Sequence, residues 1–322
     1  MRRLTLGVAL IAIMWLATAL AGDEPPRLFN DGSRVVFLGD SITYDGRYTH
    51  YLEAHLLVHH PERQIECINV GLPSEGVTGL TEPAHPFPRP NLHERLSRVL
   101  DQLQPDLVIA CYGMNDGIYH PFSEERFAAY QAGMEKLIAQ VTSSGAKLIV
   151  ITPPPFDPLP VRDKLRDASA GEFSWVHPYR DYDAVLARYS QWLLHMNDPR
   201  LSAVVDARTP TIEHLRSRRQ AEPQYTLTAD GVHTNAAGQW LIARAVLEKI
   251  GCGQETLAPD AGSPQLLRLV GERQELLGRA WLTHIGHERP NTPPGEPLEQ
   301  ATAKAGQLHE QARQIARSVG KP

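Results

Sequence analysis

Five short apolar segments alternate along the chain with longer stretches in which apolar residues recur at helical spacing. The short segments are rich in Val, Ile and Leu, as expected of strands that are buried on both faces. We expect strands at residues 34–38, 64–69, 106–112, 147–152 and 202–205, and helices at residues 47–58, 92–103, 124–143, 182–196 and 236–250. This alternation predicts an α/β fold with a five-stranded, mostly parallel sheet and helices on both faces.

The composition changes after Cys252. Residues 256–264 have the character of a linker, and residues 265–287 carry an apolar stripe at helical spacing. A turn rich in Pro and Gly then leads to a second expected helix at residues 298–319. We expect these two helices to pack on the main domain, because such a stripe is more often a core contact than a partner site. Dimerisation or partner docking through them is the alternative.

The first 21 residues have the pattern of an export signal. Arg2 and Arg3 precede a nearly continuous apolar stretch, which ends in small residues suited to cleavage. We therefore expect a secreted or periplasmic protein with no stable membrane insertion after cleavage; an uncleaved membrane anchor is the alternative, because the stretch approaches bilayer-spanning length. The expected organisation is a signal peptide at 1–21, a main domain at 22–255 and a C-terminal helical extension at 256–322.

Charge and cysteine content narrow the classes of partner and cofactor. The formal net charge is −5 and no basic stripe occurs, which argues against a nucleic-acid partner. The three cysteines make no disulfide framework, and Cys67 and Cys111 lie in apolar segments, where we expect them in the core. Because the sequence shows no clustered metal-ligand spacing, we predict no metal site and no cofactor.

Residues with catalytic chemistry follow the expected strand ends. Ser41 follows the first strand within Gly-Asp-Ser, Asn115 follows the third, and Asp230 and His233 precede the helix at 236–250, for which Asn235 is the expected N-cap. The carboxyl ends of parallel strands share one edge of a sheet, where ligands bind. A serine hydroxyl needs a nearby base such as histidine, which a carboxylate in turn orients. Taken singly, each segment could equally be an ordinary helix cap, turn or structural histidine.

Taken together and in this order, the segments resemble the SGNH/GDSL hydrolase family, which includes esterases, lipases and carbohydrate deacetylases. The matching blocks are residues 39–43, 69–75, 113–116 and 230–233, and the resemblance covers roughly residues 34–250. It implies a flavodoxin-like three-layer α/β/α sandwich. It also implies a triad of Ser41 as nucleophile, His233 as base and Asp230 as the carboxylate that orients the histidine.

The resemblance further implies an oxyanion hole made by the main-chain N–H of Ser41, the side-chain amide of Asn115 and a main-chain N–H of the second block. Counted along that block, the family's glycine falls on Ser74, whereas the glycine present is Gly71. We favour Ser74, with Gly71 as the alternative, since a main-chain donor does not require a particular side chain. Asp40 and Asp116 are expected to brace loops rather than to react.

These inferences predict a serine esterase that forms an acyl-enzyme and acts on a small-molecule or glycan ester. O-deacetylation of a carbohydrate is favoured by the export signal, by the acidic balance and by Trp175, Tyr179 and Trp192 near the expected substrate loops. The alternatives are a lipase or lysophospholipase acting on fatty acyl esters, and a non-catalytic glycan-binding protein. The irregular, Pro-rich segments 70–90 and 153–160 either shape the substrate cleft or cover the sheet end. The sequence makes no prediction of oligomeric state.

Overall fold

The computed structural model describes residues 28–252 and 262–319, and in them a five-stranded parallel sheet forms the centre of the protein. The strand order is β2-β1-β3-β4-β5 and every neighbouring pair is parallel. The strands are β1 (Arg34–Gly39), β2 (Glu66–Asn69), β3 (Leu107–Cys111), β4 (Lys147–Ile151) and β5 (Ala203–Val205). This confirms the predicted α/β class and sheet. The predicted signal peptide at 1–21 and most of the expected linker lie outside the described residues.

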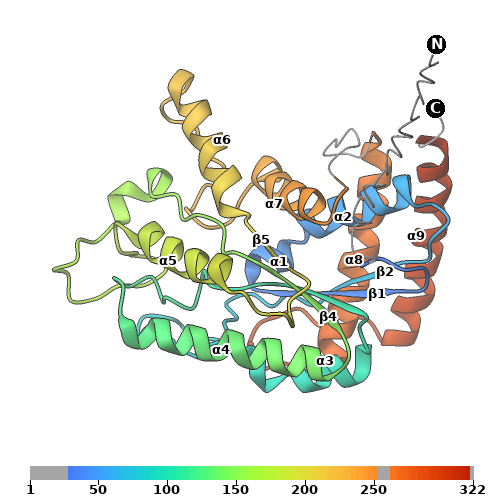
Figure 1. The fold of residues 1–322 in the computed structure, drawn as a ribbon, viewed down its shortest axis with the longest axis horizontal. Helices are drawn as coiled ribbons and strands as arrows, with labels where there is room; N and C mark the ends of the chain where they lie inside the picture. The colour runs from blue at the N-terminus through green and yellow to red at the C-terminus, as the bar shows by residue number, and fades with distance from the viewer. Residues whose placement is uncertain (1–27, 253–261, 320–322) are drawn as a thin grey trace, which may run out of the picture.

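Helices cover both faces of the sheet (Figure 1). On one face α2 (Arg47–His59) packs against α7 (Ala236–Lys249), while α3 (Leu96–Leu103) and α4 (Glu124–Ser143) lie on the other. Helix α5 (Tyr182–His195) adjoins α4, as the stacked rings of Tyr130 and Tyr189 show. The crossover from β1 to β2 runs along the sheet in the opposite direction to the later crossovers. Because parallel crossovers are right-handed, α2, which lies in this connection, falls on the opposite face from α3 and α4.

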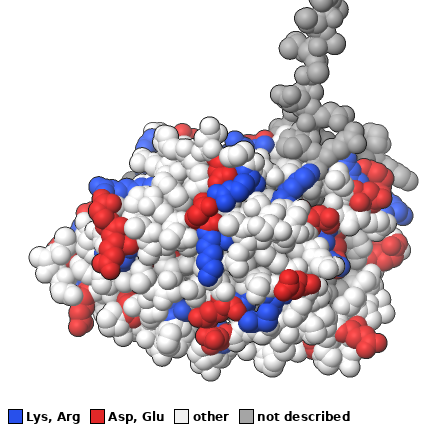
Figure 2. All heavy atoms as spheres, turned by 60° about the horizontal axis from the view of Figure 1, so that its bottom comes forward, with Lys and Arg blue, Asp and Glu red and all other residues white. Residues whose placement is uncertain are grey.

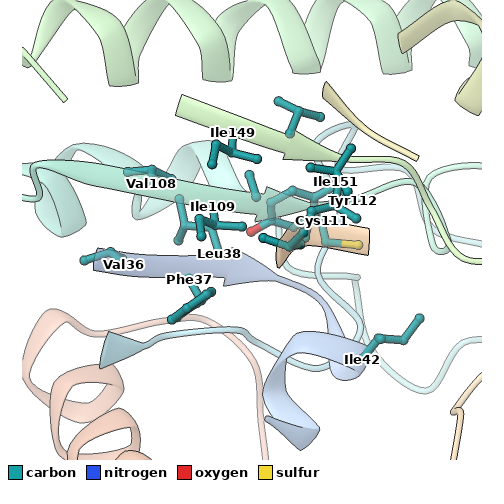
Figure 3. Close-up of a cluster of buried hydrophobic side chains, with 14 of the residues drawn as sticks. Val36, Phe37, Leu38, Ile42, Val108, Ile109, Cys111, Tyr112, Ile149 and Ile151 are labelled. Carbon is teal, nitrogen blue, oxygen red and sulfur yellow. The ribbon is translucent and has the colours of Figure 1, made fainter. Parts of the chain in front are cut away.

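The core consists of the strands and the inner faces of these helices. Figure 3 shows side chains of β1, β3 and β4 stacked across the sheet, including Phe37, Ile109 and Ile149. All three are 1 % exposed or less. Because helices cover both faces, successive residues of a strand are buried alike, which explains the continuous apolar segments in the sequence.

The main domain differs from the sequence-based expectation in two short helices that were not predicted, α1 (Ser41–Asp45) and the 3-10 helix η2 (Leu159–Lys164), and in two further features. A polar helix, α6 (Arg208–Ala221), was not predicted; it buries just Arg208, Thr211 and Leu215, so it shows little apolar periodicity. The expected helix at 92–103 is divided into a short 3-10 turn, η1 (Leu92–Glu94), and α3. Arg95 lies between them, and its backbone is not helical, with a φ of −120° and a ψ of −12°. Its side chain is buried against Glu75, so a tertiary ion pair interrupts the helical pattern.

The two predicted C-terminal helices are present as α8 (Pro264–Ile285) and α9 (Leu298–Val319). They pack against each other and against α2, and α8 also lies along the edge strand β2 (Figure 1). A Cβ atom on Gly278 would come within 2.4 Å of the Asn69 carbonyl oxygen, so glycine is needed for α8 to approach β2 this closely. The pair thereby covers a strand edge that would otherwise be exposed. The boundary between residues 255 and 256 stays a prediction.

The charged side chains are mixed in sign on the face shown in Figure 2, where Lys and Arg alternate with Asp and Glu over a largely uncharged surface. Within the described ranges, no helix combines the length and apolar character that crossing a bilayer requires.

Candidate active site

The structure brings three of the predicted site residues into one hydrogen-bonded chain. Ser41 is the first residue of the short helix α1 (Ser41–Asp45), which follows β1 directly. Its Oγ lies 2.7 Å from His233 Nε2, and His233 Nδ1 lies 2.6 Å from Asp230 Oδ2. The serine and the histidine are 192 positions apart in the chain, so the fold alone makes this contact.

The loop that carries Asp230 and His233 is fixed by its own main chain. Asp230 Oδ1 accepts hydrogen bonds from the N–H groups of Val232 and His233, at 2.9 and 2.8 Å. The second carboxylate oxygen is therefore free to face the imidazole. The Pro-rich segment after β4 supports this loop, because the Asp157 N–H donates to the Gly231 carbonyl at 2.9 Å. Asn235 caps α7 immediately afterwards, as predicted.

The hydrogen bonding and charges around Ser41, His233 and Asp230 raise the pKa of the His233 imidazole. The hydrogen bond to Asp230 raises the pKa of His233 above its ordinary value, although burial opposes this. Burial alone would raise the pKa of Asp230, but hydrogen bonds from His233 and from the Val232 N–H lower that pKa well below its usual range. Asp230 therefore stays ionised and holds the Nδ1 proton, which leaves the Nε2 lone pair facing the Ser41 hydroxyl.

Asp40 and Asp116 support loops, as expected. Asp40 accepts the Ile42 N–H at 2.9 Å and caps α1, and burial raises its pKa to about 7. Asp116 Oδ1 accepts the N–H groups of Val77 and Thr78 at 2.8 and 3.0 Å, which fastens the segment after β2 to the segment after β3.

Ser74 and Gly71, the two alternatives for the second main-chain donor, differ in what their N–H groups do. The Gly71 N–H donates to Asn69 Oδ1 at 2.9 Å and is already used. In the described part of the chain no hydrogen bond is found for the Ser74 N–H. The geometry thus favours Ser74 over Gly71, and its role stays a prediction. A Cβ on Gly71 would come within 2.7 Å of the Tyr44 nitrogen, so this glycine serves close packing.

Ser74 has a φ of 69°, in the left-handed region that favours glycine. We expect Ser74→Gly to raise the free energy of unfolding by up to about 1 kcal/mol, because it relieves this strain while keeping the N–H. Denaturant titration measures the change. Gly71→Ala is the matched comparison and should destabilise, since its new methyl group would meet the α1 backbone. A less stable Ser74→Gly variant would contradict the interpretation.

Asn115 is held by a buried ion pair, Arg89 with Glu82, that was not predicted from the sequence. Arg89 donates from Nη1 to Asn115 Oδ1 at 2.9 Å, and Glu82 binds the same guanidinium through two contacts of 2.7 Å. A guanidinium can only donate, so the amide oxygen must face Arg89 and the NH₂ group must face away. One of its hydrogens bonds the Glu75 carbonyl at 3.0 Å. The other has no partner in the described structure.

A second buried network supports the loop that bears Ser74. The Glu75 carboxylate pairs with Arg95 at 2.6 Å and accepts the Tyr112 hydroxyl at 2.6 Å. Both networks begin in the irregular segment 70–90, which therefore shapes the site. The one feature of the sequence that could have indicated these networks is the presence of charged residues within a Pro-rich segment. The spacing of these residues, however, does not show which of them pair.

A cleft of about 430 Å³ opens beside Ser41 and His233. Tyr44 and Asp45 of α1 line one side of it, and Glu275 and Arg279 of α8 line the other. No site residue was expected in the C-terminal extension, because an apolar stripe gives no information about what the opposite face of a helix borders.

The aromatic residues expected near the substrate differ in their surroundings. Trp192 packs edge-on against aromatic rings of α4 and belongs to the core layer rather than to a substrate loop. Tyr179 packs against Phe173 and the core. Trp175 is 53 % exposed, and its main-chain N–H donates to Glu82, the residue that pairs with Arg89. Of the three, Trp175 has the most exposed side chain.

Cys67 and Cys111 are buried, as predicted. Among residues 28–252 and 262–319 no group of three or more His, Cys, Asp or Glu side chains is arranged to hold a metal ion.

Comparison with known proteins matches residues 37–241 to the profile of the GDSL-like Lipase/Acylhydrolase family. No curated protein sequence matches the chain. Among solved structures, the gut microbial diltiazem-metabolizing enzyme BT4096 is similar with a TM-score of 0.55 and 18 % identity over 69 % of this chain, which shows a shared fold. The alignment covers 48 % of BT4096, so the chain spans about half of that protein's length.

Two further structures are similar at lower TM-scores. The acetylxylan esterase Axe2 from Geobacillus stearothermophilus has a TM-score of 0.47 and 23 % identity, covering 70 % of this chain and 96 % of Axe2. A protein of Parabacteroides merdae described as a GDSL-like lipase has a TM-score of 0.48 and 18 % identity, covering 70 % of this chain and 98 % of its own.

Proposed function

Because the chain belongs to the GDSL-like lipase/acylhydrolase family, we propose that it hydrolyses carboxylic esters with Ser41, His233 and Asp230 as its catalytic triad. The observation that carries this proposal is the chain of 2.7 and 2.6 Å hydrogen bonds from Ser41 Oγ through His233 to Asp230. Nucleophile, base and orienting carboxylate stand in the geometry that acyl transfer requires.

In the proposed reaction, His233 Nε2 takes the proton of Ser41 while Oγ attacks the ester carbonyl carbon. His233 then gives that proton to the leaving alcohol, and the acyl group remains on Ser41. A water molecule, activated by the same imidazole, attacks the acyl-enzyme, releases the acid and restores the serine. Asp230 keeps the imidazole in the required tautomer and stabilises it when it is protonated.

The oxyanion of each tetrahedral intermediate needs donors that are fixed beforehand. The Ser41 N–H is the first of α1 and so has no partner within the helix. The Ser74 N–H and the second hydrogen of the Asn115 amide complete the proposed set. We assign Arg89 and Glu82 as positioning residues, since they orient Asn115 and do not line the cleft beside Ser41.

Asn115→Ala is expected to lower kcat by about 10²–10³-fold, the usual loss for one oxyanion donor. Steady-state kinetics on a short-chain ester measures it, with KM changing much less than kcat because the lost bond forms mainly in the transition state. A loss below about threefold with an intact fold would remove Asn115 from the oxyanion hole.

For the substrate we propose an O-acetylated carbohydrate. Most residues that line the cleft beside Ser41 carry a polar group, and among the described ones Leu282 alone is aliphatic, although carbon atoms of these side chains make up much of the cleft surface. A long fatty acyl chain would need an extended apolar groove. Trp175 does not line this cleft, but its exposed ring offers a separate surface on which a sugar ring can pack.

Two measurements test the proposal. Fluorophosphonate treatment of the pure protein should give one adduct, mapped by peptide mass spectrometry to Ser41. A panel of acetylated sugars and of p-nitrophenyl esters of increasing chain length should show acetyl preference. No adduct and no hydrolysis would identify a non-catalytic protein, whereas rates that rise with acyl length would support a lipase.

The proposal includes export, with residues 1–21 removed as a signal peptide. The intact mass of the protein recovered from its native host should be lower than 35.8 kDa by those residues. The full mass, recovered in the membrane fraction, would instead indicate an anchor.

A further inference from the structure

Helix α8 lies beyond residues 37–241, the part of the chain that matches the family profile, and yet it forms a wall of the cleft beside Ser41. Glu275, Gly278, Arg279 and Leu282 all line this cleft. Gly278 and Arg279 come three and four residues after Glu275, and Leu282 comes seven residues after it, which places all four on one face of the helix. The C-terminal extension thus completes a substrate cleft that the matched domain would leave open on this side.

The wall is held in place by buried polar contacts to α2. Gln274 accepts the Thr49 hydroxyl at 2.6 Å and donates to Glu53 at 2.6 Å and to the Thr49 carbonyl at 3.2 Å. Arg273 donates to Glu53 at 3.0 Å and to the Cys67 carbonyl of β2 at 3.1 Å. The amide of Gln274 is therefore fully used, so this residue positions α8 and has no donor left for a ligand.

Glu275 and Arg279 have polar capacity that the protein does not use. They form an ion pair one helical turn apart, with side chains 58 % and 43 % exposed. In the described structure that pair is the single polar interaction of the guanidinium, which has five N–H donors. The pair presents hydrogen-bond donors and acceptors side by side in the cleft. Neighbouring hydroxyl groups of one ligand could therefore donate to Glu275 and accept from Arg279.

The charge of the cleft disfavours an anionic ligand. Burial lowers the pKa of His50 to about 4, so this residue is uncharged near neutral pH. Asp45 and Glu275 then face a single lining arginine, Arg279. The cleft has no excess positive charge with which to hold a phosphate or carboxylate, whereas an uncharged polyhydroxy group suits it.

The position of the cleft indicates which part of the ester occupies it. His233 must lie close to the leaving oxygen to protonate it. The cleft is lined by Ser41 and His233, while Ser74 and Asn115, the proposed oxyanion donors, are absent from its described lining. We infer that α8 binds the alcohol portion of the ester, and that Glu275 and Arg279 hydrogen-bond the hydroxyl groups of a polyhydroxy alcohol. This inference rests on the proposed esterase function.

The test compares two acetyl esters that differ only in their alcohol, monoacetylated glucose and ethyl acetate. Arg279→Ala and Glu275→Ala should each lower the ratio of kcat/KM for the sugar ester to kcat/KM for ethyl acetate by about tenfold, chiefly through a higher KM for the sugar ester. Arg279→Lys should give a smaller loss, because lysine keeps the charge but not the planar fork of donors.

Arg244→Ala is the matched control. Arg244 forms the same kind of exposed pair one turn along a helix, with Glu248 on α7, and does not line this cleft. This variant should leave the ratio unchanged.

Three results overturn the inference. They are an unchanged ratio in both α8 variants, an equal fall with Arg244→Ala, and a wild-type enzyme that does not prefer the sugar ester. In each of them fluorophosphonate still labels Ser41, so the esterase proposal stands. Failure of the wild-type protein to react with the fluorophosphonate is the distinct outcome that removes the esterase proposal itself.

Discussion

Replacement of Ser41 by alanine is expected to lower kcat by about 10⁴–10⁶-fold, the largest effect that any single side chain should have here. The variant loses the atom that forms the acyl-enzyme, and His233 and the oxyanion donors can then do little more than assist attack by water. Hydrolysis of p-nitrophenyl acetate, followed with active-site titration of the wild type, measures the loss.

The Ser41 side chain caps no other group in the described structure, and its one side-chain hydrogen bond is to His233. We therefore expect the thermal midpoint of Ser41→Ala to stay close to that of the wild type, which separates loss of chemistry from loss of fold. A variant that retains more than a tenth of the wild-type rate, with fluorophosphonate adducts elsewhere, would place the nucleophile at another residue.

The second large effect is expected for Asp230→Asn, which should lower kcat by about 10⁴-fold at neutral pH. The asparagine is nearly the same size, so the loop should fold. Its amide, however, can present an N–H to His233 Nδ1 and so favour the tautomer whose Nε2 carries the proton. That tautomer cannot accept the proton of Ser41. A loss below about tenfold would show that Asp230 does not orient the base.

The pH profile supplies an independent readout of the same pair. Only neutral His233 can act as the base, and the hydrogen bond to Asp230 raises the pKa of His233. Wild-type kcat/KM should therefore fall as the pH is lowered, with a midpoint above the ordinary histidine value of about 6.5. In Asp230→Asn the midpoint should move to lower pH, because the carboxylate that favours the imidazolium is gone.

The pH dependence of stability has the opposite sign to that of activity. A raised histidine pKa means that the folded state binds the proton more tightly than the unfolded chain. This contribution to stability is complete below the unfolded pKa of about 6.5 and is lost as the pH rises through the raised folded value. We therefore expect protonation of His233 to lower activity while it favours the folded state.

The titration of Asp40 must be distinguished from that of His233 in such a pH profile, since burial raises the pKa of Asp40 to about 7. Asp40→Asn removes this titration and keeps an oxygen that can accept the Ile42 N–H. If His233 is the group observed, the acid limb should persist in Asp40→Asn and shift in Asp230→Asn. The reverse pattern would assign the limb to Asp40.

Much of the fold could be predicted because its cause is local along the chain. The strands are continuous apolar segments, and Asn235 before α7 is a cap that depends on neighbouring residues only. Helix α6 escaped prediction because its stability depends on tertiary contacts, such as the ion pair of Arg208 with Asp183, rather than on an apolar stripe.

The same distinction separates the parts of the candidate site. By itself, the sequence determined which residues could react, since parallel topology brings Ser41 and Asn115 to one sheet edge wherever their strands form. Only the tertiary structure decided that Arg89 and Glu82 orient the Asn115 amide, that the Ser74 N–H is available while that of Gly71 is bonded, and that α8 closes the cleft. Those features are set by side-chain direction and by contacts between residues far apart in the chain, and neither leaves a periodic trace in a single sequence.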